Sequence, residues 1–336
     1  MSRVGVIGGG SWGTALANLL ADNGHEVRLW VRDRGLARTL ERERHNPIYL
    51  PGIRLSDEVA PGSDLAAAVE GVEVLVSAVP SHATREVWER AAGGLDPETL
   101  VVSTSKGIEN DTLARMTEVL DEILPAGARH RVAVLSGPSF AIEVACGYPT
   151  AVTAAAVDLE VAERARDLFA NPRFRVYTST DVVGVELGGA VKNIVAIAAG
   201  ICDGLRFGHN ARAALITRGI AEIARLGVAL GGEPMTFMGL TGLGDLVLTC
   251  TADLSRNRTV GLRVGAGETL EEIQSDMRMV AEGVRTTRAV RDLARRHDVE
   301  MPITEEVHSM LYEGKDPRIS VEDLMTREFK PEFERR

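Results

Sequence analysis

The sequence predicts an α/β fold in which a doubly wound parallel sheet is followed by an all-helical domain. In the first half, short valine-rich runs bounded by turn residues alternate with helical stretches. After about residue 184 this alternation stops, and long segments with helical spacing continue through Val307. With 336 residues, 45% of them hydrophobic, the chain is long enough for two domains. We expect one domain over residues 1–184 and a second over residues 185–336.

Seven strands are expected in the first domain, in chain order Arg3–Ile7, Glu26–Val31, Val74–Val79, Leu100–Thr104, Val132–Leu135, Thr150–Ala154 and Arg173–Tyr177. The helical stretches between them include Trp12–Asn23, Leu65–Glu70 and Thr112–Leu124. Alternating strands and helices are typical of a doubly wound sheet with helices on both faces. Only the last residues, "KPEFERR", have the composition of a solvated tail.

Composition narrows the classes of protein. A net charge of −10 and a pI near 5.3 argue against nucleic-acid binding, which depends on a positive field. The three cysteines, Cys146, Cys202 and Cys250, are too few for a disulfide framework and favour a reducing, cytoplasmic compartment. We expect no export signal and no membrane insertion, because no basic leader and no uncharged bilayer-length apolar stretch is present. Scattered histidines without ligand spacing predict no metal site.

Three glycines near the start of the chain form a G-x-G-x-x-G motif. Gly8, Gly10 and Gly13 directly follow the strand Arg3–Ile7 and open a helix. In the Rossmann dinucleotide fingerprint the first glycine permits a tight turn, the second lets the backbone approach a pyrophosphate, and the third allows close packing of helix on strand. An ordinary strand-to-helix turn is the alternative. The position and the βαβ spacing favour dinucleotide binding.

The end of the second strand carries Arg32, followed by Asp33. An acidic residue at this point usually accepts a hydrogen bond from the ribose 2′-hydroxyl of NAD, whereas an arginine suits the 2′-phosphate of NADP. The sequence therefore favours NADPH, and Asp33 leaves use of NADH open. The alternative is that Arg32 is a solvated charge at the end of the strand.

Two loops place polar groups at the carboxyl ends of strands, where open parallel sheets bind ligands. "VSTSKGIE" puts Lys106 beyond the fourth expected strand, and "LSGPSFAIE" puts Gly137, Ser139 and Ala141 beyond the fifth. Each loop taken singly could also be a plain turn.

Lys192 is the only charge in the small, apolar segment from Gly188 to Ile201. Its side chain either extends to solvent or lies in a desolvated pocket, where burial lowers the lysine pKa and a carboxylate compensates. The second arrangement would make Lys192 an acid/base catalyst.

Further polar residues follow in the helical half. "MGLTGLGDLVLTC" surrounds Asp245 with glycines, and "LSRNRTVG" presents Ser255, Arg256 and Asn257 in succession. A carboxylate among glycines can bind a hydroxyl or pair with a lysine, and the Arg-Asn pair can bind a phosphate. The alternative for the second stretch is a helix start capped by Ser255.

Taken together, these motifs resemble those of one family. "GGGSWG", "SKGIE", "GPSFA", "VKNIVAIAAG", "GLGDL" and "SRNR" occur in this order across nearly the whole chain, as in bacterial NAD(P)-dependent sn-glycerol-3-phosphate dehydrogenases. The resemblance implies a Rossmann-like domain followed by a helical domain like the C-terminal domain of 6-phosphogluconate dehydrogenase. It also implies reversible hydride transfer between NAD(P)H and dihydroxyacetone phosphate, giving sn-glycerol 3-phosphate for phospholipid synthesis. A homodimer is expected.

The resemblance also implies roles for individual residues. Lys192 would be the acid/base, with Lys106 and Asp245 completing the catalytic group. The substrate would contact Lys106, Gly137, Ser139, Lys192, Asp245, Ser255, Arg256 and Asn257, with Thr249 as a weaker candidate. The cofactor would contact Ser11, Trp12, Arg32, Lys106, Ala141, Arg256, Val280 and Glu282, besides Gly8, Gly10 and Gly13.

Two rival readings stay open at this point. A hydroxyacid or ketopantoate reductase could share the fold and a helical lysine while acting on a carboxylate substrate. A non-catalytic dinucleotide sensor could bind the cofactor without turnover, but that reading leaves Lys192, Asp245 and the Ser-Arg-Asn run without a role.

Overall fold

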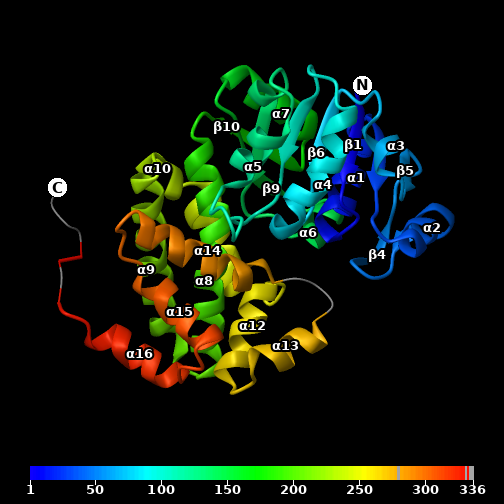
Figure 1. Cartoon of the computed structure of the whole chain (residues 1–336). Helices are drawn as coiled ribbons and strands as arrows, with labels where there is room; N and C mark the ends of the chain where they lie inside the picture. The colour runs from blue at the N-terminus through cyan, green and yellow to red at the C-terminus, as the bar shows by residue number, and fades with distance from the viewer. Residues whose placement is uncertain (278–280, 330, 333–336) are drawn as a thin grey trace.

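The computed structural model describes residues 1–277, 281–329 and 331–332. It consists of a sheet domain flanked by helices, coloured blue to green in Figure 1, and a helical domain, coloured mainly yellow to red. The long helix α8 (Val182–Gly204) begins three residues after the last strand of the sheet and runs into the helical domain. This architecture confirms the predicted fold class. The boundary at residues 184/185 stays a prediction, although it falls within the first turn of α8.

The sheet contains eight strands in the order β10-β9-β8-β7-β6-β1-β2-β5. Their bounds are β1 Arg3–Ile7, β2 Glu26–Trp30, β5 Val59–Gly62, β6 Val74–Ser77, β7 Leu100–Ser103, β8 Val132–Ser136, β9 Thr150–Ala155 and β10 Phe174–Ser179. All seven expected strands are present to within two residues at each end. The eighth, β5, was not predicted, and a separate two-stranded hairpin, β3 (His45–Asn46) with β4 (Leu50–Arg54), was not predicted either.

The expectation of a wholly parallel sheet is wrong at one place. β8 and β9 pair antiparallel, whereas β9 and β10 pair parallel to each other. The connection from β8 to β9 contains only the five-residue helix α6 (Ala141–Ala145), about 7.5 Å long at 1.5 Å per residue. A strand such as β8 spans roughly 17 Å, so α6 is too short to return the chain to the opposite edge of the sheet. The next strand therefore starts where β8 ends and runs back.

Helices cover both faces of the sheet. α1 (Ser11–Asp22) and α7 (Leu159–Phe169) bury their apolar sides in one core cluster, while α3 (Leu65–Val69), α4 (Thr84–Ala91) and α5 (Met116–Ile123) contribute to the cluster on the other face. The remaining elements of this domain are α2 Arg34–Glu43, η1 Ser81–Ala83, η2 Ala92–Gly94 and η3 Arg129–Arg131.

One predicted helix begins later than expected. The stretch from Thr112 becomes helical only at Met116, the first residue of α5. Leu113 has φ 63°, in the left-handed region that an α-helix excludes, and Ile108 forms an isolated antiparallel bridge with Arg115. The residues before Met116 are therefore held in a turn that competes with the helix.

The second domain is helical throughout its described residues, as predicted. Its helices after α8 are α9 Gly208–Ala229, α10 Pro234–Phe237, the π-helical turn η4 Leu240–Gly244, α11 Asp245–Thr251, α12 Arg256–Gly265, α13 Leu270–Asp276, α14 Glu282–Arg296, α15 Pro302–Tyr312 and α16 Pro317–Thr326. α8 runs through the centre of this domain, and residues from most of the other helices form one apolar cluster around it.

By length and composition α8 could cross a membrane, since it has 23 residues and a mean hydropathy of 1.6 over its most apolar window. In the structure 89% of that window is buried inside the protein. The helix also carries the charges of Glu186 and Lys192, both buried. These features fit the core helix of a globular domain.

Glycines bring α8 and α12 unusually close. A Cβ atom on Gly200 would lie 2.0 Å from the Arg258 carbonyl oxygen, and one on Gly261 would lie 1.9 Å from the Ile197 carbonyl oxygen. Any larger residue would force the two backbones apart. This contact places the N-terminus of α12 beside the middle of α8.

Candidate active site

The ammonium group of Lys192 lies in the interior, where α8 passes α11. Its side chain is 7% exposed, and Nζ donates to Asp245 Oδ1 at 2.5 Å and to Thr249 Oγ1 at 2.6 Å. Asp245 is the first residue of α11 and Thr249 follows one turn later, so both face Lys192 from one side of that helix. The structure therefore places the lysine in the desolvated pocket that was one of its two predicted locations.

Lys106 reaches the same carboxylate from the sheet domain. Its Nζ donates to Asp245 Oδ2 at 2.7 Å and to the Gly137 carbonyl oxygen at 3.0 Å. The Ser139 hydroxyl donates to the same Gly137 carbonyl at 3.0 Å. Gly137 itself has φ 144°, and a Cβ there would lie 2.9 Å from Val152 Cα, which requires glycine at this point. The two predicted loops thus meet α8 and α11 at one point.

The charges gathered here control the protonation of Lys192 and Asp245. The pKa of Lys192 is lowered to about 8, because burial outweighs the opposing effect of the Asp245 carboxylate and the charge of Lys106 acts in the same direction as burial. Burial opposes ionisation of Asp245, but the two lysines outweigh it and hold the pKa of that carboxyl below its ordinary value. With side chains 18% exposed for Lys106 and 2% exposed for Asp245, this is a nearly dry site. Such a lysine can give or take a proton near neutral pH.

The Ser-Arg-Asn run begins α12 beside this group. Ser255 caps the helix by accepting from the Arg258 N–H, so the capping role considered from the sequence is real. Asn257 is buried and spans two helices: its Nδ2 donates to Asn193 Oδ1 at 3.0 Å, and its Oδ1 accepts from the Gly283 N–H at 2.9 Å. Arg256 has an exposed side chain.

The glycine turn between β1 and α1 fits a pyrophosphate. Gly8 has φ 121°, a Cβ on Gly13 would lie 1.8 Å from the Gly8 carbonyl oxygen, and a Cβ on Gly10 would meet nothing within 4 Å. No side chain caps the N-terminus of α1, where Ser11 and Trp12 are the first helical residues. The positive end of the helix dipole can therefore attract an anion into the open space beside Gly10.

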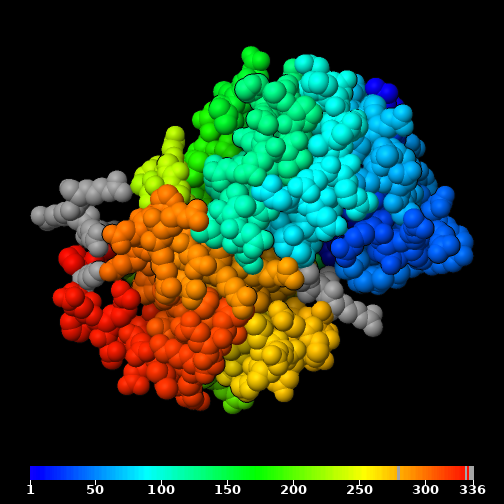
Figure 2. All heavy atoms as spheres, viewed as in Figure 1, coloured from blue at the N-terminus to red at the C-terminus, as the bar shows by residue number. Residues whose placement is uncertain are grey.

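Other predicted cofactor residues lie on separate elements of the two domains. Arg32 is exposed just after β2, and Ala141 is the first residue of α6. Glu282, at the start of α14, accepts from the Ser81 N–H at 3.1 Å, which ties the helical domain to the sheet domain. Figure 2 shows α14, in orange, lying against the cyan part of the sheet domain. Val280 lies outside the described residues.

Two residues that contact this site, Asn193 and Ser81, were not predicted from the sequence. Asn193 is adjacent to Lys192 and could have been noticed because it is polar within an apolar run. Ser81 contributes only its backbone N–H, and no sequence pattern marks that contribution. No group of three or more His, Cys, Asp or Glu side chains suited to a metal ion occurs within the described part of the chain.

Comparisons with known proteins match this arrangement. Residues 3–162 and 181–322 match the family models for the NAD-dependent glycerol-3-phosphate dehydrogenase N-terminus and C-terminus. The chain is 55% identical over 330 residues to glycerol-3-phosphate dehydrogenase (NAD(P)+) of Citrifermentans bemidjiense, covering 98% of each chain. The crystal structure of the Coxiella burnetii glycerol-3-phosphate dehydrogenase aligns with TM-score 0.92 and 42% identity, over 97% of this chain and 99% of that one.

A more distant likeness concerns one of the rival readings. A ketopantoate reductase of Ralstonia eutropha aligns with TM-score 0.59 and 16% identity, over 96% of this chain and 99% of that one. At this identity the likeness shows a shared fold only. The two family models, by contrast, cover most of the sequence and both carry the same description. The chain therefore belongs to the NAD-dependent glycerol-3-phosphate dehydrogenase family.

Proposed function

We propose that this protein interconverts dihydroxyacetone phosphate and sn-glycerol 3-phosphate with NADPH or NADH as the hydride carrier. The observation that carries the proposal is the Lys192–Asp245–Lys106 group at the carboxyl ends of β7 and β8, in which the pKa of the buried Lys192 is lowered to about 8. A ketone accepting hydride develops negative charge on oxygen, and a buried ammonium both stabilises that charge and supplies the proton.

Each member of this group has its own task. The nicotinamide, when bound, supplies or accepts the hydride. Lys192 donates a proton to the substrate oxygen in the reductive direction and removes the hydroxyl proton in the oxidative direction. The negative charge of Asp245 raises the pKa of Lys192 and so favours its ammonium form. Thr249 accepts a hydrogen bond from Lys192 Nζ and holds this nitrogen in place. Lys106 adds a second positive charge, which stabilises the oxyanion further.

The test is the loss of reduced-nicotinamide absorbance with dihydroxyacetone phosphate, run with NADPH and NADH in parallel. We expect turnover with both and a preference for NADPH, because Arg32 is exposed at the end of β2 and can pair with a 2′-phosphate. Ketopantoate and 2-oxo acids serve as the control substrates. Turnover of these carboxylates without turnover of the phosphoester would assign the protein to the rival activity.

The reaction should depend on pH through Lys192. Its pKa is lowered to about 8, so the ammonium form required for reduction is present below pH 8 and lost above it. We expect kcat/KM for dihydroxyacetone phosphate to fall as pH rises through about 8, and oxidation of glycerol 3-phosphate to rise over the same range. Rates of reduction and of oxidation measured from about pH 6 to about pH 10 would show both trends. A reductive rate that stays level throughout this range would contradict the assignment of the proton donor.

Arg256 is proposed to bind the substrate phosphate. It lies in the first turn of α12, close enough to the site for its charge to act on Glu282. We expect Arg256→Ala to raise KM for dihydroxyacetone phosphate by about 30-fold or more, since a charge-assisted bond contributes about 2 kcal/mol. Arg263→Ala, at the other end of the same helix, is the control and should leave KM unchanged. Equal KM values for the two variants would remove Arg256 from the phosphate site.

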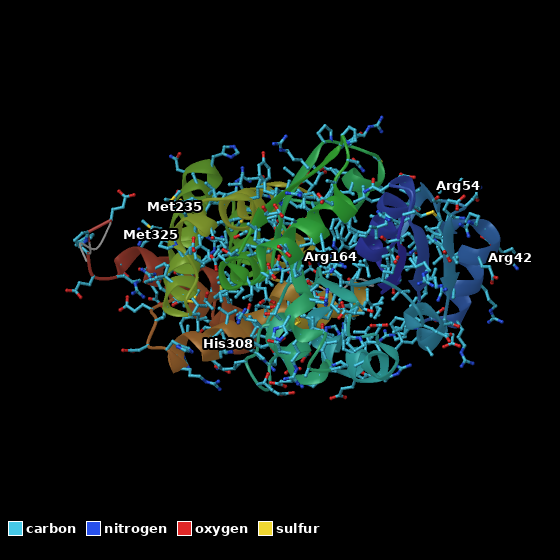
Figure 3. The ribbon with its side chains drawn as sticks, turned by 90° about the horizontal axis from the view of Figure 1, so that it is seen from above. Arg42, Arg54, Arg164, Met235, His308 and Met325 are labelled. Atoms are coloured by element: carbon cyan, nitrogen blue, oxygen red, sulfur yellow. The ribbon has the colours of Figure 1, made fainter. Side chains whose placement is uncertain are left out.

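We also propose a cytoplasmic homodimer that supplies phospholipid synthesis. Apolar side chains are exposed from α10 to α11, where Met235 is 75%, Met238 49% and Val247 41% exposed. Figure 3 shows Met235 at the end of the molecule far from Arg42 of α2, so a partner there would leave the glycine turn open. Sedimentation equilibrium would give the mass, and a monomer at micromolar concentration would count against the dimer.

A further inference from the structure

The β3–β4 hairpin, absent from the sequence prediction, contacts the glycine turn through Asn46. This side chain is 0% exposed. Its Nδ2 donates to the Gly9 carbonyl oxygen at 3.0 Å and to Thr14 Oγ1 at 2.9 Å, and its Oδ1 accepts from the Tyr49 N–H at 3.0 Å. Both amide protons and the amide oxygen are therefore occupied, which fixes the orientation of the side chain.

A second contact joins the same two segments. The hydroxyl of Ser11, the first residue of α1, donates to the Tyr49 carbonyl oxygen at 2.5 Å. On its other side the glycine turn packs on Val31, the residue that follows β2, because a Cβ on Gly9 would lie 2.7 Å from Val31 Cγ2. Gly9 is thus enclosed between the hairpin and Val31.

Fixing the Gly9 carbonyl also fixes the N–H that follows it. A trans peptide is planar, so its C=O and N–H point in opposite directions. While Asn46 holds the Gly9 oxygen toward the hairpin, the Gly10 N–H points away from the hairpin. Space beside Gly10 is open, and an anion at the N-terminus of α1 would approach there. Glycine peptides rotate easily when nothing holds them, so this orientation has to be maintained by a contact.

We propose that Asn46 is a positioning residue for the cofactor: it sets the Gly9–Gly10 peptide so that the Gly10 N–H faces the pyrophosphate of the dinucleotide. This inference rests on the proposed dehydrogenase function, because it needs a dinucleotide at the glycine turn. It predicts that loss of the amide weakens cofactor binding specifically. Substrate binding and proton transfer, which depend on α8, α11 and α12, stay as they are.

The structure offers a matched control for this proposal. Asn18, on α1, also makes two hydrogen bonds near the end of the hairpin. Its Nδ2 donates to the Arg54 carbonyl oxygen at 2.9 Å, and its Oδ1 accepts from the Ser56 N–H at 2.9 Å. Neither of these bonds involves the glycine turn. Figure 3 shows Arg54 at the outer edge of the sheet domain. A residue that only fastens the hairpin would behave like Asn18.

The experiment compares Asn46→Ala with Asn18→Ala by NADPH fluorescence titration and steady-state kinetics. For Asn46→Ala we expect the Kd for NADPH to rise about 10-fold, with KM for dihydroxyacetone phosphate and kcat at saturating NADPH within about twofold of the parent. For Asn18→Ala we expect no change in that Kd. Equal changes in the two variants, or a rise confined to the substrate KM, would overturn the proposal.

Two further measurements keep the result interpretable. Melting curves without cofactor check that each variant folds. If Asn46→Ala does not fold, Asn46→Asp replaces it, because this variant keeps the shape and the Tyr49 contact but presents an acceptor to the Gly9 oxygen. The same rise in Kd is expected, and an unchanged Kd would refute the proposal. Wild-type protein that neither binds NADPH nor reduces dihydroxyacetone phosphate would refute the proposed function instead.

Discussion

Replacing Lys192 with alanine is expected to lower kcat by on the order of 10³-fold or more while NADPH still binds. The variant removes both the proton donor and the positive charge that faces the developing oxyanion. Asp245 keeps its contact with Lys106 at 2.7 Å, so no unpaired carboxylate is left buried and the fold should survive. Pre-steady-state absorbance and NADPH titration measure turnover and binding separately.

Lys192→Met is the matched variant for this test, because it keeps the length and apolar stem of the side chain without the amine. Both variants should show the same loss. If either turned over within about tenfold of the wild type, proton transfer and charge stabilisation by this residue would be excluded, since general acid–base catalysis alone contributes about 10²–10⁴-fold.

Asp245→Asn should produce the second largest loss. Without the carboxylate, two ammonium groups face each other in the interior, and the pKa of Lys192 falls below about 8 because burial and Lys106 are no longer opposed. We expect kcat for reduction at neutral pH to drop by about 10²-fold and the remaining activity to move to lower pH. The free energy of unfolding should fall by about 3–5 kcal/mol, as when one member of a buried ion pair is removed.

A surface aspartate provides the comparison for this stability measurement. Asp253 pairs with Arg258 at 2.8 Å, but its side chain is 98% exposed. Asp253→Asn should change the free energy of unfolding by less than about 1 kcal/mol. A similar effect of the two substitutions would mean that Asp245 is exposed to water in solution. It would contradict the conclusion that burial controls the charges of this site.

Much of the fold follows from patterns along the sequence. Seven of the strands between Arg3 and Ser179 are predictable because buried strands read as continuous valine-rich runs. β4 and β5 were missed because Pro51, Gly52 and Pro61 interrupt them, and such residues are typical of turns. The reversal between β8 and β9 was missed because strand direction depends on the path of the connection, which is not visible in local periodicity.

The candidate site was predictable to a similar degree. The motifs placed Lys106, Lys192 and Asp245 in functional segments, but only the fold shows that one carboxylate joins both lysines across 139 and 53 residues of sequence. The sequence of α8 alone does not show whether Lys192 reaches solvent, because that depends on the helices that pack around α8. Asn46 gave no signal, because a single polar residue in a loop-like stretch resembles many others.

The central position of α8 has a consequence for biosynthesis. Gly204 leaves the ribosome before any of the helices that later cover α8, and at ordinary translation rates the chain up to Thr326 follows over roughly 6–24 s. During that interval most of this 23-residue apolar segment lacks the later helices that bury it in the folded protein. The nascent chain therefore presents a binding site for hydrophobe-recognising chaperones, which disappears once the C-terminal third has docked.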